Sequence, residues 1–338
     1  RDEDLFNRVF PMDMRPQAHE IIRTWLFSSV VRADLENDEL PWQHAAISGW
    51  ILDPDRKKMS KSKGNVVTPM DMLDEYSSDA VRYWAASGRP GTDTAFDIGQ
   101  MKIGRRLAIK LLNASKFALT LSQLSSDLDR TNITAATIVE PVDLALLAKL
   151  ALTVESATNA FEDFNYAKAL DATETFFWEF TDDYVELVKE RAYGETEGVN
   201  AESARATLLI TLDTLLRLFA PFLPFTTEET WSWFNTDSIH TSHWPQTQSL
   251  QELAPDGKIA LLTTATEALR MIRKAKSEAK LSMRAEVASA SFAGTPEMET
   301  HINLVAADLK AAGSIDTLRT TSAPDVSALK AQIVLAEQ

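Results

Sequence analysis

The chain has 338 residues, of which 45% are hydrophobic and 25% charged, and its formal net charge is −15. These values are typical of a soluble globular protein with room for several packed units, and we expect no apolar run long enough to span a bilayer. The absence of cysteine excludes disulfides, thiolate chemistry and cysteine-based zinc sites, and it fits a cytoplasmic protein. The start, Arg1-Asp2-Glu3, has no initiator methionine and no signal peptide pattern, so we expect a piece of a longer protein.

Charge is distributed unevenly along the chain. Residues 56–116 carry a net charge of +6, residues 117–254 carry −15, and residues 255–338 are neutral. The basic segment is therefore the expected phosphate-facing surface. In the acidic segment, any contact with RNA must depend on local patches and on base stacking rather than on bulk attraction.

The first 55 residues predict one helix and one buried strand. The run from Ala18 to Ala33 has helical apolar spacing, and from pattern alone Trp25 is one of its core residues. The run from Ala45 to Leu52 is short and apolar, as in a buried strand. Gly49 inside that strand can mark a close approach by a ligand.

The most distinctive stretch runs from Lys57 to Asn65. It contains four lysines and two serines within seven residues and closes with Gly64-Asn65. Lysine ammonium groups on long stems can follow a moving polyphosphate, and serine hydroxyls and loop N–H groups can add directional bonds. The stretch lacks the leading glycine of the Gly-rich phosphate loop. For a lysine cluster in arbitrary order, a solvated basic loop would be the alternative.

The order of these residues points to a known family. Lys58-Met59-Ser60-Lys61-Ser62 resembles the second signature of the class I aminoacyl-tRNA synthetases, and Lys63-Gly64-Asn65-Val66-Val67 resembles their valine branch. The resemblance implies a Rossmann-like α/β catalytic core that binds ATP, with Mg²⁺ accompanying the nucleotide. No metal site formed by the protein is expected, because the His240/His243 pair has no third ligand nearby in the sequence.

The resemblance also implies roles for individual residues. Lys58 and Lys61 would be catalytic, since they would stabilise charge on the phosphates, and Trp25 would form a wall of the amino-acid pocket. His19 receives no role. Ser48 stands where the family often has histidine, which leaves only a backbone role at that strand end. The residues expected to bind ATP are Lys58, Ser60, Lys61, Ser62, Gly49, Trp50 and Glu20.

From Met101 onward the apolar spacing predicts a series of helices. Leu107, Leu111, Ala114, Ala118 and Leu121 mark the buried face of the first. Further helices are expected from Pro141 to Phe161 and from Tyr166 to Arg191. Another carries the apolar residues from Leu208 to Phe219 and is ended by Pro221. Thr226-x-x-Glu229 reads as a capping box that opens a short one. Phe176-Phe177-Trp178 and Phe219-Ala220-Pro221-Phe222-Leu223-Pro224 resemble the helical anticodon-binding domain of the same family.

The last 84 residues predict a small α+β unit. An amphipathic helix is expected from Lys258 to Lys280, with Arg270, Arg273 and Lys274 facing away from its apolar side. Residues 285–293 and Ile315–Thr320 read as strands, and Glu297 to Ala311 as a helix. Val326 to Glu337 would be the beginning of a helical arm.

These elements define a multidomain fold. We expect the C-terminal part of the Rossmann-like core, then an all-α helical-bundle anticodon-binding domain, then the small α+β unit. The predicted segments are 1–55 for the core, 56–112 for the lysine loop and a connecting segment that contacts the tRNA stem, 113–250 for the anticodon-binding domain, and 255–338 for the C-terminal unit.

The resemblance implies an enzyme that joins valine to ATP, releases pyrophosphate and transfers valine to tRNA(Val), acting as a cytoplasmic monomer without a membrane partner. The family's His-x-Gly-His signature does not occur in this sequence, and its editing insertion is missing. We therefore expect the chain alone to be inactive as a ligase while it keeps surface that binds tRNA.

Two alternatives remain open. The first is a synthetase of the same class for isoleucine, leucine or methionine. Lys63-Gly64-Asn65 and the absence of cysteine argue against the isoleucine and methionine enzymes. The second is a non-catalytic tRNA-binding module, which the presence of Lys58 and Lys61 disfavours.

Overall fold

The computed structural model describes residues 2–125, 128, 132–194 and 198–336. The chain divides into two compact units, Arg1–Ala108 with Thr158–Asp171, and Ile109–Ala157 with Ala172–Gln338. Both are rich in helix, and the whole is a mixed α/β structure. Three helices contribute residues to both units: α5 (Ile98–Ser122), α6 (Pro141–Glu162) and α7 (Tyr166–Glu179). The four-segment division stays a prediction.

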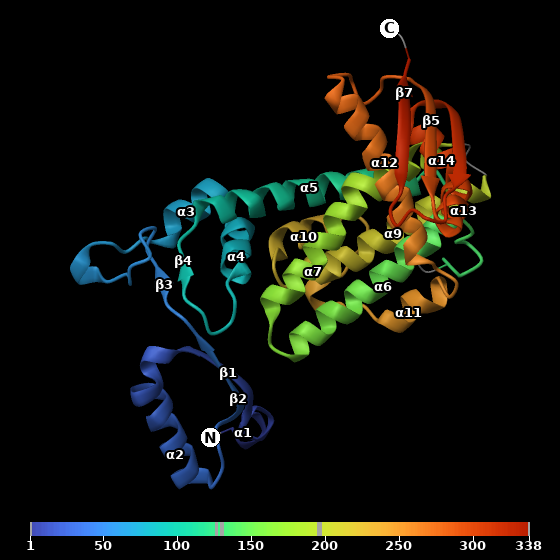
Figure 1. Ribbon diagram of the computed structural model, residues 1–338. Helices are drawn as coiled ribbons and strands as arrows, with labels where there is room; N and C mark the ends of the chain where they lie inside the picture. The colour runs from blue at the N-terminus through green and yellow to red at the C-terminus, as the bar shows by residue number, and fades with distance from the viewer. Residues whose placement is uncertain (1, 126–127, 129–131, 195–197, 337–338) are drawn as a thin grey trace. The chain divides into compact units, whose positions relative to one another are not determined.

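The first unit is built on a βαβ crossover (Figure 1). After α1 (Glu3–Val9), strand β1 (Met12–Ala18) pairs in parallel with β2 (Trp42–Ser48), and Ala18 lies opposite Ser48. Parallel strands need a long crossover connection. Here it is made by η1 (His19–Ile21), η2 (Ile22–Leu26) and α2 (Phe27–Asn37). The carboxyl ends of β1 and β2 therefore meet at one edge, which is where ligands bind in open α/β sheets.

The expected helix from Ala18 to Ala33 is not continuous. It begins with the 3₁₀ turn η1, passes through the π-helical turn η2, and becomes α-helical only at Phe27. The hydroxyls of Ser28 and Ser29 donate to the carbonyl oxygen of Trp25 in the π turn, at 3.1 and 2.8 Å. Apolar spacing does not distinguish a π turn from an α turn, which explains why the sequence pattern missed it.

The expected strand from Ala45 to Leu52 is split by Gly49 and Trp50. β2 ends at Ser48, and β3 (Ile51–Leu52) pairs in parallel with β4 (Thr94–Ala95) in a separate sheet. At this break the backbone of Thr92 lies directly beside Gly49. The short helices α3 (Pro69–Tyr76) and α4 (Ser78–Ser87) follow the lysine loop, and Ser77 is the N-cap of α4.

The second unit contains a helical core. Leu111, Ala118 and Leu121 of α5 are buried, as their spacing predicts. The helix expected from Tyr166 to Arg191 is interrupted by the π turn η4 (Phe180–Tyr184), which shifts the facing of the residues after it. The helical core also contains α8 (Val185–Tyr193), α9 (Val199–Phe219), α10 (Pro224–Trp231) and α11 (Thr247–Leu253), with the turn η5 (Ile239–Thr241) between the last two.

The capping box expected at Thr226 is wrong. Helix α10 begins two residues earlier, at Pro224 with Leu223 as N-cap, so Thr226 lies inside the helix. Proline favours the first helical position because its ring fixes a helical φ angle. Glu229 is consequently not a cap residue, and its carboxylate accepts a hydrogen bond from Trp233 Nε1 at 3.0 Å.

Helix α6 also departs from expectation. Among the described residues it is the one helix that is long and apolar enough to cross a membrane by length and composition, although 50% of that stretch is buried inside the structure. Leu146, Leu150 and Val154 are fully buried. This burial is typical of the core helix of a globular protein.

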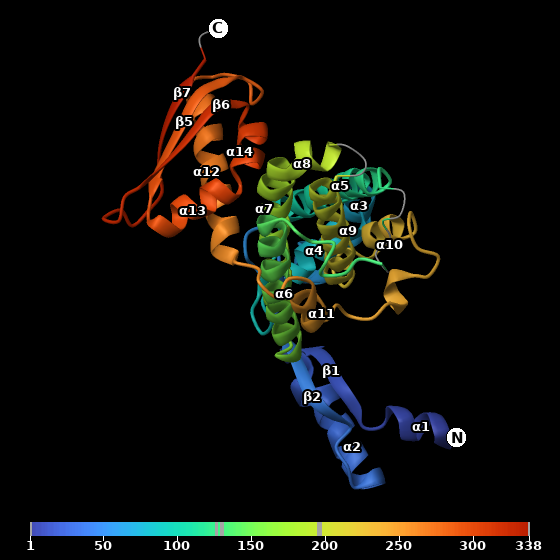
Figure 2. The same ribbon diagram turned by 90° about the vertical axis from the view of Figure 1, so that its right-hand side faces the viewer.

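The C-terminal part of the second unit is a three-stranded sheet with helices along one side (Figure 2). β5 (Val287–Gly294) is central, parallel to β6 (Ile315–Ser322) and antiparallel to β7 (Lys330–Leu335). The first two strands match the sequence prediction. The predicted beginning of a helical arm after Val326 is wrong, because this segment forms the strand β7, which pairs with the side of β5 opposite to β6.

The helices of this region are α12 (Ile259–Glu278), α13 (Pro296–Leu304) and α14 (Ala306–Gly313). The apolar side predicted for α12 is confirmed, since Leu262, Leu269 and Ile272 are fully buried. The single helix expected from Glu297 to Ala311 is broken at Val305. Arg270 and Arg273 do not simply face solvent, because both form ion pairs with Asp183 of η4.

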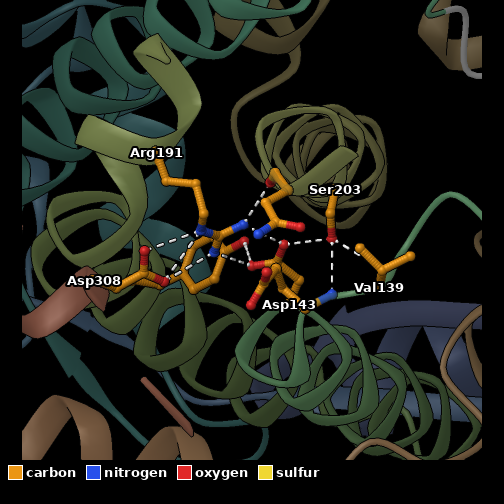
Figure 3. Close-up of polar contacts among 8 residues, drawn as sticks. Val139, Asp143, Arg191, Ser203 and Asp308 are labelled. Atoms are coloured by element: carbon orange, nitrogen blue, oxygen red, sulfur yellow. Dashed lines mark hydrogen bonds and ion pairs between the residues drawn. The ribbon is translucent and has the colours of Figure 1, made fainter. Parts of the chain in front are cut away.

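A buried ion cluster joins α14 to the helical core (Figure 3). Arg191 of α8 donates from Nη1 and Nη2 to the carboxylate of Asp143 at 2.9 and 2.8 Å, and from Nε and Nη2 to that of Asp308 at 3.0 Å. The hydroxyls of Tyr184 and Ser203 donate to Asp143 at 2.8 and 2.7 Å. Burial opposes the charge of Arg191, yet the two aspartates raise its pKa above the ordinary value.

Candidate functional site

The lysine loop is closed by Asp53 and Asn65. The buried Asp53 carboxylate accepts from Lys57 N at 2.7 Å and from Asn65 Nδ2 at 2.8 Å. These bonds, from Lys57 first and then Asn65, hold the pKa of Asp53 below its usual value, so it stays ionised. Asn65 also donates to Lys58 O at 3.2 Å and accepts from Ser60 N at 2.9 Å. One asparagine thus fastens both sides of the loop.

The middle of the loop is a short 3₁₀ turn, η3 (Lys61–Lys63). The hydroxyls of Ser60 and Ser62 lie 3.2 Å apart, so the two predicted ATP-binding serines face each other. The side chain of Lys61 lies outside the part of the structure that is described. Gly64 has φ +67°, a left-handed conformation that glycine adopts without strain. The turn therefore needs glycine there for its backbone shape.

Lys58, Glu20 and Trp50 meet in one cluster. Lys58 Nζ lies 2.6 Å from Glu20 Oε2, and Trp50 Nε1 donates to the same oxygen at 3.1 Å. The ammonium group also lies 4.2 Å from the centroid of the Trp50 ring. The bond from Lys58, then that from Trp50, lowers the pKa of Glu20, so its carboxylate stays charged. Three residues predicted separately are thereby brought together at the carboxyl edge of β1 and β2.

The backbone around Trp50 explains how this cluster is held. Trp50 N donates to Asp93 Oδ1 at 2.8 Å, and Trp50 O accepts from Thr94 N at 2.9 Å. A Cβ atom on Gly49 would lie 2.3 Å from the carbonyl carbon and oxygen of Thr92. The small size of Gly49 is therefore required by the chain's own backbone, which is a different reason from the ligand approach expected from the sequence.

His19 contributes to the cluster although sequence reasoning gave it no role. Its ring packs against the Trp50 ring with centroids 4.7 Å apart, and its Nδ1 lies 3.2 Å from Ser48 O. A carbonyl oxygen only accepts, so this contact requires a proton on Nδ1. Asp93 and Asn65 were missed for the same reason as His19. Asp93 acts on Trp50, 43 residues away, and the bonds of Asn65 form only when the loop folds back on itself.

Trp25 belongs to a second cluster within the same unit. Its ring stacks on Trp42 with centroids 6.0 Å apart and planes within 5°, and the Arg15 guanidinium lies 3.6 Å from its ring centroid. Trp42 is buried, whereas 40% of Trp25 is exposed. A partly exposed, flat indole surface suits contact with an apolar side chain. One face of the Trp25 indole is covered by the Arg15 guanidinium, and its role as a wall of the amino-acid pocket stays a prediction.

The basic residues of α5 have specific neighbours. Arg105 Nη1 donates to Glu75 O at 3.1 Å, Lys110 Nζ lies 3.0 Å from Asp182 Oδ1, and Lys116 Nζ lies 5.8 Å from the Trp233 ring centroid. Two of these side chains are therefore engaged by a carbonyl or carboxylate oxygen of the protein. Among the described residues, no group of three His, Cys, Asp or Glu side chains is arranged to hold a metal ion.

Comparison with known proteins identifies the family. A model of class I tRNA synthetases (I, L, M and V) matches residues 1–97, and a model of the anticodon-binding domain of tRNA ligases matches residues 143–291. The Valine--tRNA ligase of Thermobifida fusca is 58% identical over 317 residues, which are 94% of this chain and 35% of that protein. The chain belongs to the class I tRNA synthetase family.

Further relatives agree with this assignment. The Valine--tRNA ligase of Salinispora tropica is 54% identical over 95% of this chain and 39% of that protein, so the chain spans little more than a third of these relatives. A crystal structure of the ternary complex of Agrobacterium radiobacter K84 agnB2 LeuRS-tRNA-LeuAMS superimposes with a TM-score of 0.59 at 21% identity. The matched region covers 73% of the present chain and 30% of the LeuRS chain, and at this identity the likeness supports the fold alone.

Proposed function

We propose that the protein containing this chain is a valine--tRNA ligase of the cytoplasm. The valine carboxylate would attack the α-phosphorus of ATP, pyrophosphate would leave, and a hydroxyl of tRNA(Val) would then displace AMP from the activated valine. The observation that carries the proposal is the identity of up to 58% to valine--tRNA ligases, together with the Lys58–Glu20–Trp50 cluster at the sheet edge.

The proposed chemistry requires positive charge at the phosphates. Negative charge builds on the α-phosphate and the leaving pyrophosphate, and Lys58 and Lys61 would stabilise it. Ser60 and Ser62 would donate hydroxyl hydrogen bonds as the loop closes over the nucleotide. Glu20 and the backbone at Gly49 and Trp50 would bind the nucleoside part of ATP, and Trp25 would line the valine pocket. Mg²⁺ prefers substrate phosphates with few protein ligands, so it would be held chiefly by ATP.

The test is valine-dependent ATP–pyrophosphate exchange by the intact protein. Lys61→Ala and Lys58→Ala should each lower the exchange rate by roughly 10²–10³-fold, the usual cost of losing one pre-organised contact to a transition-state charge. Lys57→Ala is the control, because Lys57 is 70% exposed and pairs only loosely with Asp55 at 3.7 Å. Its rate should stay close to that of the unchanged protein.

Two outcomes would contradict the proposal. Exchange that depends on isoleucine or leucine rather than valine would favour the related synthetases. Full exchange in both the Lys58 and Lys61 variants would remove the loop from the chemistry and favour a module that binds tRNA without catalysis. The chain alone, as a monomer, should bind tRNA(Val) without supporting exchange.

A further inference from the structure

We propose that Trp233, with Lys116 beside it, forms a stacking platform for one unpaired base of the RNA partner. The inference rests on the proposed function, since it assigns a specific contact with tRNA to residues outside the loop that handles ATP. Trp233 lies inside the segment 143–291 matched by the anticodon-binding model, and Lys116 lies on α5.

The indole of Trp233 is exposed and yet fixed. Trp233 lies two residues after Trp231, the last residue of α10, and its N–H donates to Thr230 O at 3.2 Å. Its Nε1 donates to Glu229 Oε1 at 3.0 Å, which sets the orientation of the ring, and 37% of the residue remains exposed. A ring that is already held in place loses little conformational entropy when a base stacks on it.

Lys116 supplies positive charge next to this ring. Its Nζ lies 5.8 Å from the ring centroid, within the range of a cation–π contact, and the residue is exposed. An ammonium group at that distance can reach the phosphate of a nucleotide whose base is stacked on the indole. Aromatic stacking with an adjacent cation is the usual way in which proteins bind single-stranded nucleic acid.

The surrounding charge decides which kind of RNA contact is possible. Glu228 and Glu229 lie on α10 and Asp237 follows it, within a segment whose net charge is −15. Glu228 is occupied, because it accepts from Ser238 Oγ and Ile239 N at 3.0 and 2.9 Å. A phosphate backbone would be repelled along most of this surface. A contact that depends on the π face of one base, with a single lysine for its phosphate, avoids that repulsion.

A protein partner fits the same surface less well. The centre of a protein interface is depleted of charged residues, whereas Trp233 has Glu229 and Lys116 as immediate neighbours. Phe225, which is 65% exposed, lies four residues before Glu229 on α10, so a second exposed ring is present on the helix face that carries Glu229. Two exposed rings separated by a carboxylate are better matched to bases than to a continuous apolar patch.

The experiment uses the intact protein and tRNA(Val) transcripts that carry 2-aminopurine at each unpaired loop position in turn. Trp233→Leu keeps an apolar side chain but removes the ring, and it should weaken binding roughly 5- to 150-fold, the range for losing one stacked base. The same variant should lose the fluorescence quenching of 2-aminopurine at one position. Trp233→Phe keeps a ring and should restore most of both signals.

Lys116→Ala is the second variant, and it leaves the Trp233–Glu229 bond in place. It should reduce the slope of log affinity against log salt by about 0.7, the value for one phosphate of a single strand. Tyr166→Leu is the matched control, because Tyr166 has the same exposure of 37% and lies on α7. It should change neither affinity nor quenching.

The outcomes separate this inference from the proposed function. If the unchanged protein charges and binds tRNA(Val) while Trp233→Leu binds equally tightly, only the stacking platform is refuted. It is also refuted if the leucine and phenylalanine variants weaken binding equally and no 2-aminopurine position changes, since Trp233 would then act only by packing. If the unchanged protein neither charges nor binds tRNA(Val), the proposed function itself fails.

Discussion

Replacing Arg191 by methionine should destabilise the second unit strongly. The Arg191 side chain is 12% exposed, while those of its partners Asp143 and Asp308 are 0% and 8% exposed, so the cluster is shielded from water. Methionine keeps much of the apolar stem but leaves two buried carboxylates without a cation. Removing one partner of a buried ion pair typically costs about 3–5 kcal/mol, and we expect a loss of free energy of unfolding in that range.

Thermal and urea unfolding of the unchanged and variant chains would measure this loss. For a unit of roughly 200 residues, about 3–5 kcal/mol corresponds to a fall in Tm of roughly 6–20 °C. Lys189→Met is the control on the same helix, because Lys189 forms an exposed pair with Glu186 that should contribute less than about 1 kcal/mol. A variant Arg191→Met within 1 kcal/mol of the unchanged chain would show that the cluster is not the tie between α14 and the helical core.

Two further predictions concern single residues. Burial, more than the nearby Asp143 and Asp308, raises the pKa of Glu140 in the folded chain. The stability that its protonated carboxyl contributes is therefore fully present below about pH 4.3, the pKa in the unfolded chain, and it is lost as the pH rises through the folded pKa. Glu140→Gln should therefore stabilise the chain at pH 7, with the gain vanishing below pH 4 in urea titrations; a gain that persists at low pH would contradict this. Gly49→Ala places Cβ 2.3 Å from the Thr92 carbonyl and should cost about 1–3 kcal/mol in thermal unfolding without any nucleotide. No loss would mean that this approach is not tight.

Local pattern predicted most helices of the chain. The start of α6 at Pro141 follows from the preference of proline for the first helical turn, and the buried residues of α12 follow from apolar spacing. The two π turns could not be seen this way, since inserting one residue into a helix shifts its facing without changing its composition. The strand β7 was missed because it lies at the edge of the sheet, where even the apolar Val334 is exposed to solvent. Its sequence therefore does not alternate between buried apolar and exposed polar residues.

The candidate site was predictable in composition but not in arrangement. Lys58 and the loop serines are recognisable from their order, whereas Glu20 and Trp25 were chosen only through a family resemblance. The contact between Glu20 and Lys58 joins residues 38 positions apart, and the contact between Arg191 and Asp308 joins residues 117 apart. No local periodicity encodes such pairs. Asn65 shows the same limit, since its bonds to Asp53 and Ser60 exist only once the loop has folded back.

The geometry of Glu20 constrains how the proposed ATP site can work. Its Oε2 accepts from both Lys58 and Trp50, so this oxygen is saturated by the protein. Under the proposed function, Glu20 would bind the nucleoside and Lys58 would bind the phosphates, so the phosphates would compete with the Glu20 carboxylate for the Lys58 ammonium group. ATP resolves the conflict because its phosphates offer Lys58 a stronger negative charge than one carboxylate. Nucleotide binding and movement of the lysine loop would therefore be a single exchange of ion pairs, with Asp53 and Asn65 as the fixed base on which the loop turns.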